Sequence, residues 1–220
     1  MTRYRRDLPQ LARRLFLTDG GLETTLVFHK GIDLPCFAAF DLMRDREGRA
    51  LIADYYRPYL EIARQHGTGF ILESATWRAS RDWGERLGYS ATALAAVNCE
   101  CIELCEELRG EYESDAFPIV ISACVGPRGD GYRPDRPMTA DEAAAYHAQQ
   151  IEIFAATAAD LVTAMTINHA EEAIGIAEAA KAAGIPVAIS FTVETDGRLP
   201  TGQTLADAIG QVDRETGRAP

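Results

Sequence analysis

The chain has 220 residues, 47% of them hydrophobic, and its 33 Asp and Glu against 22 Lys and Arg give a net charge of −11. This length predicts one domain or at most two, and we treat residues 1–220 as a single domain. The negative charge argues against nucleic acid or an anionic membrane as a main partner. No apolar run approaches the ~20 residues that a membrane span needs, so no membrane partner is expected.

The N-terminus and the cysteines bear on the compartment. Met1 to Arg6 is basic, but the apolar stretch of a secretory signal does not follow. Five cysteines, an odd number, fit a reducing environment, and we expect a cytoplasmic protein, with a homo-oligomer as a possible state. On a helix, Cys101 and Cys105 share one face with leucines, which favours core packing over metal binding.

Apolar runs alternate with helical patterns along the whole chain. Runs rich in Ile, Val, Leu and Phe predict strands at 15–19, 69–74, 118–125, 160–167 and 186–193. They are nearly continuous in apolar character, as strands buried on both faces of a parallel sheet are. Helical spacing and capping residues predict helices at 49–66, 90–109, 140–158, 170–183 and 202–216, with Ser90, Thr139 and Thr204 as N-caps.

This alternation predicts a parallel α/β architecture with right-handed crossovers. The glycine-rich phosphate turn that opens many doubly wound sheets is absent, and so is a Walker A sequence. A (β/α)8 barrel needs roughly 250 residues, and five β-α units amount to about five-eighths of one. Two long loops, at 26–48 and 126–138, follow strand ends on the side where barrel active sites are built.

Polar residues at the ends of the predicted strands are the candidate site. Asp19-Gly20-Gly21 places a carboxylate beside bare backbone at the mouth of the first strand, where it could hold an ammonium group; an N-cap and a plain turn are the alternatives. Thr76 and Trp77 follow the second strand, with a strand-end cap and a core position as alternatives. Asn168 follows the fourth strand. For His169 we expect a surface loop, and for Glu73 and Glu194 a solvated or ion-paired role.

Several short motifs occur in an order that resembles the homocysteine S-methyltransferases. They are Leu17-Thr18-Asp19-Gly20-Gly21-Leu22-Glu23-Thr24, Thr76-Trp77-Arg78-Ala79-Ser80, Val125-Gly126-Pro127 with Gly129, Glu171-Glu172-Ala173, and Ile189-Ser190-Phe191-Thr192-Val193 followed by Asp196-Gly197-Arg198-Leu199. Each motif alone is weak. Their order, from about residue 15 to the C-terminus, is what makes the resemblance specific.

The resemblance implies a (β/α)8 barrel that transfers a methyl group from a small donor to the thiol of homocysteine, giving methionine. The candidate substrate-binding residues are Asp19, Gly20, Gly21, Thr76, Trp77, Thr166 and Asn168. The resemblance also implies a zinc ion, which three cysteines hold and whose open position takes the substrate sulfur. The methyl donor stays open among S-methylmethionine, betaine, S-adenosylmethionine and a folate or corrinoid route.

The sequence departs from the family pattern at three places. None of Cys36, Cys99, Cys101, Cys105 and Cys124 matches a zinc ligand of the family, so we expect a C-terminally shortened member without metal ligands in this chain. Met165 stands where the family usually has the Glu that binds the amino group of homocysteine, and Ala75 where Asn is common. Both departures put the thiol substrate in question, and a related thiol is an alternative.

Two other interpretations stay open. The chain could be a non-catalytic or assembly-dependent barrel fragment, because an incomplete barrel exposes sheet edges. It could also be a different barrel enzyme that uses the carboxylates of Asp19, Glu73 and Glu194 without zinc.

Overall fold

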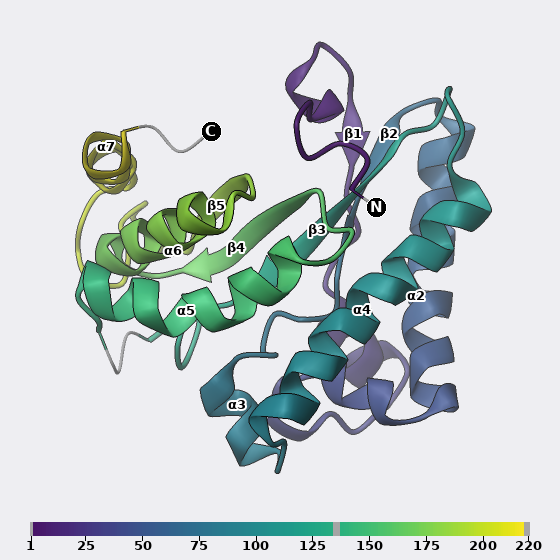
Figure 1. Ribbon diagram of the computed structural model, residues 1–220, viewed down its shortest axis with the longest axis horizontal. Coiled ribbons are helices and arrows are strands. Elements are labelled where there is room, and N and C mark those ends of the chain that lie inside the picture. Colours follow the sequence, from purple (N-terminus) through teal and green to yellow (C-terminus); the bar gives the residue numbers. More distant parts are fainter. Residues whose placement is uncertain (1, 134–136, 218–220) are drawn as a thin grey trace.

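A computed structural model describes residues 2–133 and 137–217, so residues 134–136 of the predicted loop 126–138 lie outside it. Within these residues, one parallel sheet has the strand order β1-β2-β3-β4-β5. Its strands are β1 (Phe16–Leu17), β2 (Gly69–Glu73), β3 (Ile119–Val125), β4 (Leu161–Ile167) and β5 (Val187–Phe191). The strands curl (Figure 1), and the fold is five consecutive units of a (β/α) barrel, as predicted.

The helices follow the strands in the predicted order. They are α1 (Leu22–Thr24), α2 (Arg46–Gln65), α3 (Arg81–Arg86), α4 (Ala91–Tyr112), α5 (Ala140–Ala155), α6 (Ala170–Ala183) and α7 (Leu205–Thr216). The side chains of Ser90, Thr139 and Thr204 accept the capping hydrogen bonds that the sequence predicts, and Thr139 forms a full capping box with Glu142. Gly184 ends α6 with a φ of 69°, a conformation that glycine adopts without steric cost.

Two parts of the chain are more helical than the sequence predicts. The segment 26–48 is not a plain loop: it contains a π-helical turn at Thr25–His29, 3-10 turns at Pro35–Phe37 and Ala39–Arg44, and the start of α2. The short helix α3 was not predicted, because six residues between two loops carry too little periodicity to detect.

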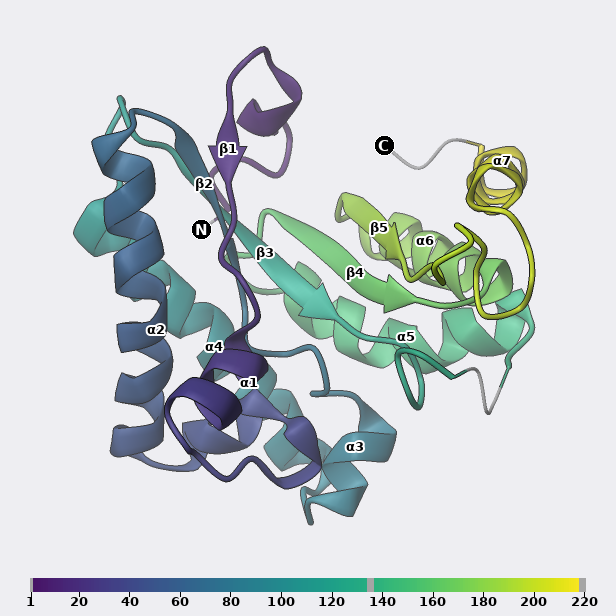
Figure 2. The same ribbon diagram turned by 180° about the vertical axis from the view of Figure 1, so that it is seen from behind.

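Burial along the strands shows where the core lies. Every residue of β3 is buried, whereas Ala188 and Ser190 of β5 are exposed. Helices α4 and α5 lie in front of the sheet in Figure 1, and the view from behind in Figure 2 shows β3 and β4 in front of α5. Cys101 and Cys105 are buried in the core between α4 and its neighbours, as predicted.

The N-terminal segment is fastened to the end of the barrel where the strands begin. The buried carboxylate of Asp160 accepts hydrogen bonds from the backbone N–H groups of Arg3, Tyr4 and Ile121 and from the guanidinium of Arg109 at 2.9 Å. The Arg5 guanidinium donates to the carbonyl oxygens of Ala155, the last residue of α5, and of Ala159 beyond it. Among the described residues, no helix is long and apolar enough to cross a membrane.

Candidate functional site at the carboxyl ends of the strands

A cavity of about 270 Å³ opens where β1, β2, β3 and β4 end. Five of the seven residues that the sequence singles out line it: Asp19, Gly20, Gly21, Trp77 and Thr166. Other lining residues are Glu23, Phe37, Tyr56, Glu73, Ala75, Cys124, Tyr132 and Met165. Active sites of (β/α) barrels form at this end of the sheet, so the cavity is the candidate site of the chain.

Asp19 is half-buried beside α2, and the hydroxyl of Tyr55 donates a hydrogen bond of 2.8 Å to its Oδ2. Burial raises the pKa of Asp19 to about 6, although the hydrogen bond from Tyr55 acts in the opposite direction. The carboxylate is therefore mostly ionised at pH 7. No Lys, Arg or His is among the described residues that line the cavity, so the negative charge faces a space without a fixed countercharge.

The glycines after Asp19 keep the backbone accessible. Gly20 and Gly21 are exposed, and a Cβ on Gly20 would come within 3.0 Å of the Tyr59 hydroxyl. Gly21 precedes α1 as its N-cap and makes no side-chain capping bond. Asp19 is not the N-cap residue of α1, and this leaves its carboxylate available to a ligand.

Trp77 and Thr166 join the ends of β2 and β4. The indole Nε1 of Trp77 donates to Thr166 Oγ1 at 3.0 Å, and the same hydroxyl donates to the Met165 carbonyl at 2.6 Å. Thr166 has a φ of 59°, which is unfavourable for a β-branched residue, and the β4–β5 register shifts between Ala164 and Ile167. Backbone strain of this kind concentrates at functional sites, where the surrounding structure holds it in place.

The loop after β3 packs directly on this pair. A Cβ on Gly126 would lie 2.4 Å from the Trp77 carbonyl oxygen, and one on Gly131 would lie 3.1 Å from Thr166 Oγ1. Only glycine therefore fits at position 126 without a shift of the backbone. Tyr132, one residue beyond Gly131, lines the cavity.

Two predicted site residues do not line the cavity. Thr76 is fully buried, and its hydroxyl donates to the Cys124 carbonyl at 2.7 Å. Asn168 is also buried, and its amide donates to the Asp130 carbonyl at 3.0 Å. Both side chains connect neighbouring segments behind the cavity wall.

A buried polar cluster that the sequence did not predict supports the same loop. Glu172, at the start of α6, is fully buried; its Oε1 accepts from the Arg128 backbone N–H at 2.7 Å and lies 2.9 Å from Nε2 of His147. His169 Nδ1 lies 2.8 Å from the Asn168 side-chain oxygen. The expectation of a surface loop for His169 is wrong: the residue is buried, and its Nε2 accepts a hydrogen bond from the Met138 N–H.

The two other carboxylates at strand ends differ from each other. Glu194 is exposed, as expected. Glu73 is half-buried, and its Oε2 is enclosed without a hydrogen-bond partner among the described residues. Burial raises the pKa of Glu73 to about 8. The negative charge of Asp19 also raises this pKa, whereas hydrogen bonding from Ser122 and Thr163 lowers it.

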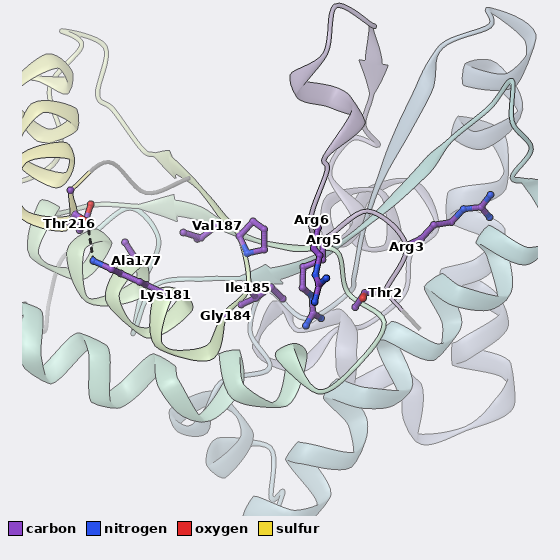
Figure 3. Close-up of a pocket in the computed structure, with 12 residues that line it drawn as sticks. Thr2, Arg3, Arg5, Arg6, Ala177, Lys181, Gly184, Ile185, Val187 and Thr216 are labelled. Carbon is purple, nitrogen blue, oxygen red and sulfur yellow. Dashed lines mark hydrogen bonds between the residues drawn. The ribbon is translucent and has the colours of Figure 1, made fainter.

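A larger cavity of about 770 Å³ lies at the opposite end of the strands, between residues 2–6 and the start of β5. Figure 3 shows Arg5 and Arg6 beside Ile185, with Lys181 reaching the Thr216 carbonyl. Two of its cations are already bonded within the chain, since Arg3 pairs with Glu113 and Arg5 binds backbone carbonyls. This end of a barrel serves stability rather than chemistry, so size does not make this cavity the active site.

The family model for homocysteine S-methyltransferase matches residues 16–219, nearly the whole chain. The chain belongs to the homocysteine S-methyltransferase family. Its fold is similar to solved structures of the homocysteine methyltransferase MmuM from Escherichia coli. The match to the metallated form has a TM-score of 0.74 at 21% sequence identity and covers 95% of this chain and 73% of the MmuM chain. The match to the oxidised form has a TM-score of 0.76 at 22% sequence identity and covers 94% of this chain and 72% of the MmuM chain. At these identities the likeness shows the fold. No curated protein sequence matches the chain significantly.

The described residues do not fit the zinc ion that membership of this family implies. No group of three or more His, Cys, Asp or Glu side chains in the described part of the chain could hold a metal. Cys124 is the cysteine among the cavity-lining residues, and burial raises the pKa of its thiol well above the ordinary value. A buried thiol that keeps its proton is a poor metal ligand.

Proposed function

We propose that the cavity at the strand ends binds homocysteine or a closely related small thiol as the acceptor of a methyl group. The observation that carries this proposal is the position of Asp19, an ionised carboxylate on an accessible cavity wall that has no basic side chain. A primary ammonium group of the substrate would supply the missing countercharge. The volume of about 270 Å³ suits a small amino acid, because pockets for drug-sized ligands begin at about 300 Å³.

In this proposal the other lining residues shape the space around the substrate. The exposed backbone at Gly20 and Gly21 would lie next to the bound ammonium group, and the bonded pair Trp77 and Thr166 would line the space around the rest of the substrate. Thr76 and Asn168 act as positioning residues through the contacts that they make behind that wall. The reaction forms a bond between the thiol sulfur and the methyl carbon and breaks the bond between that carbon and the donor. The thiol proton is lost to solvent, because the thiolate is the nucleophile.

Titration calorimetry with reduced homocysteine and the 220-residue chain tests the proposal. We expect saturable binding at one site, and Asp19→Asn should weaken it at least tenfold because the ammonium group loses its countercharge. The control is Glu194→Gln, which removes a carboxylate from an exposed strand end outside the cavity. Absence of binding to the unmodified chain, or equal loss in both variants, would contradict the proposal.

A second candidate is a non-catalytic or assembly-dependent role. Two observations favour it: the described residues do not fit zinc, and Ala188 and Ser190 of the edge strand β5 are exposed. Unpaired sheet edges promote association with another chain. Light scattering after size exclusion distinguishes the candidates, because an assembly-dependent chain self-associates or melts without cooperativity, and a monodisperse, cooperatively melting monomer contradicts this role.

A further inference from the structure

Glu73 is a half-buried acidic residue in the candidate site, and its enclosed Oε2 calls for a ligand. It is the last residue of β2, it lines the cavity together with Asp19, and its enclosed Oε2 has no hydrogen-bond partner among the described residues. A buried polar atom without a partner costs about 1–3 kcal/mol, and more if it is charged. Such a cost calls for an explanation, and a bound ligand would remove it.

No basic group of the described residues lines the cavity beside Glu73 or interacts with its carboxyl. Hydroxyls of Ser122 and Thr163 approach from β3 and β4, and the Tyr56 hydroxyl from α2 donates to the backbone carbonyl of Glu73 at 2.6 Å. The titratable groups that interact with its carboxyl are acids or neutral thiols, and they are Asp19 after β1, Cys105 on α4 and Cys124 on β3.

The carboxyl groups of Asp19 and Glu73 line one cavity, in which the described residues supply no basic side chain. Two ionised carboxylates at such a site repel each other, and the more buried one holds its proton. Glu73 is the more strongly shifted of the two, with a pKa of about 8 against about 6 for Asp19. At pH 7 the empty cavity therefore holds one ionised and one protonated carboxyl.

We propose that Glu73 is the second recognition residue for a cationic headgroup, and that it releases its proton to solvent when an ammonium ligand enters beside Asp19. The ammonium charge replaces the proton of Glu73, so both carboxyl groups become ionised. The summed charge of the two carboxyl groups and the ammonium group then equals that of the carboxyl pair before binding. Binding is thereby coupled to pH. This inference rests on the proposed function, since it takes the same cavity and the same ligand class.

Proton release is measured by titrating methionine into the full chain at pH 7 in phosphate and in Tris, two buffers of different ionisation enthalpy. Methionine carries the amino acid headgroup but has no thiol, so a released proton cannot come from the ligand sulfur. We expect about 0.9 proton released per methionine bound, given a pKa near 8, and less than about 0.2 for Glu73→Gln. Glu194→Gln is the control and should release as much as the unmodified chain.

Infrared difference spectra supply a second measurement that does not depend on affinity. The carbonyl stretch of a protonated carboxylic acid should be present in the empty protein at pH 7, decrease when methionine binds, and be absent from Glu73→Gln. Binding without proton release, or release that persists in Glu73→Gln, would overturn this inference and leave the proposed function standing. Failure of both methionine and homocysteine to bind would overturn the two together.

Discussion

The indole nitrogen of Trp77 donates a 3.0 Å hydrogen bond to the hydroxyl of Thr166, 89 residues further along the chain. This bond connects the end of β2 to the end of β4 across the mouth of the cavity. The loop that carries Tyr132 approaches both residues closely: a Cβ on Gly126 would clash with the Trp77 carbonyl oxygen, and one on Gly131 would come within 3.1 Å of Thr166 Oγ1. The bond thus joins two of the segments that form the candidate site, and a third packs against it.

Trp77→Phe should destabilise the protein by about 1 kcal/mol beyond the loss in packing, because it leaves Thr166 without its donor. Trp83→Phe is the matched control: Arg78 stacks on both indole rings, but Trp83 Nε1 has no hydrogen-bond partner among the described residues. Urea denaturation of the two variants measures the difference. Equal losses of stability would show that the bond to Thr166 contributes nothing.

The strained backbone of Thr166 predicts an unusual response to glycine. Thr166→Gly loses the hydroxyl contacts to Trp77 and to the Met165 carbonyl but relieves a φ of 59°. Thr163→Gly loses the hydroxyl contact to Ser122 with no strain to relieve. Backbone strain of this type is worth about 1–3 kcal/mol. We therefore expect Thr163→Gly to lower the free energy of unfolding by at least about 1 kcal/mol more than Thr166→Gly does. The reverse order in chemical denaturation would contradict the strain at Thr166.

Glu73 should make the folded chain less stable as pH rises. Its pKa is raised from 4.5 to about 8 by folding, so between these values the folded state binds more protons than the unfolded state. The free energy of unfolding then falls with pH across this interval. Glu73→Gln should raise the melting temperature at pH 8 and change it little at pH 4.5. A variant that is equally stabilised at both pH values would show that the carboxyl is not the cause.

Metal analysis follows from the failure of the described residues to fit zinc. Elemental mass spectrometry of the chain, purified without added metal, should find far less than one zinc per chain. A value close to one zinc per chain would show that its cysteines do form a zinc site, and metal-dependent catalysis by this chain would then again be a candidate function.

Local patterns in the sequence were enough to predict the β-α order of the fold. Continuous apolar runs mark β2 to β5, as is typical of strands in a parallel sheet, although only β3 is buried along its whole length. Capping residues such as Thr139 and Gly184 mark helix ends because they satisfy backbone groups locally. The π-helical turn at Thr25–His29 escaped prediction because tertiary packing, rather than local pattern, stabilises it.

The candidate site was predicted in part. Strand-end position alone identified Asp19 and Trp77, but it could not show which side chains face the cavity. Thr76 and Asn168 point into neighbouring segments instead, and this depends on local geometry beyond the strand pattern. The partners Tyr55 of Asp19 and Glu172 of His147 lie 36 and 25 residues away, and contacts at such separations leave no signal in a single sequence.

The ratio of the affinities for homocysteine and 4-mercaptobutanoate tests the central claim most directly. The two thiols differ only in the amino group that Asp19 is proposed to bind. Calorimetry with the full chain at pH 7 should show homocysteine binding at least tenfold more tightly, with the preference lost in Asp19→Asn. Equal affinities in the unmodified chain would contradict the claim that this cavity recognises an amino acid through Asp19.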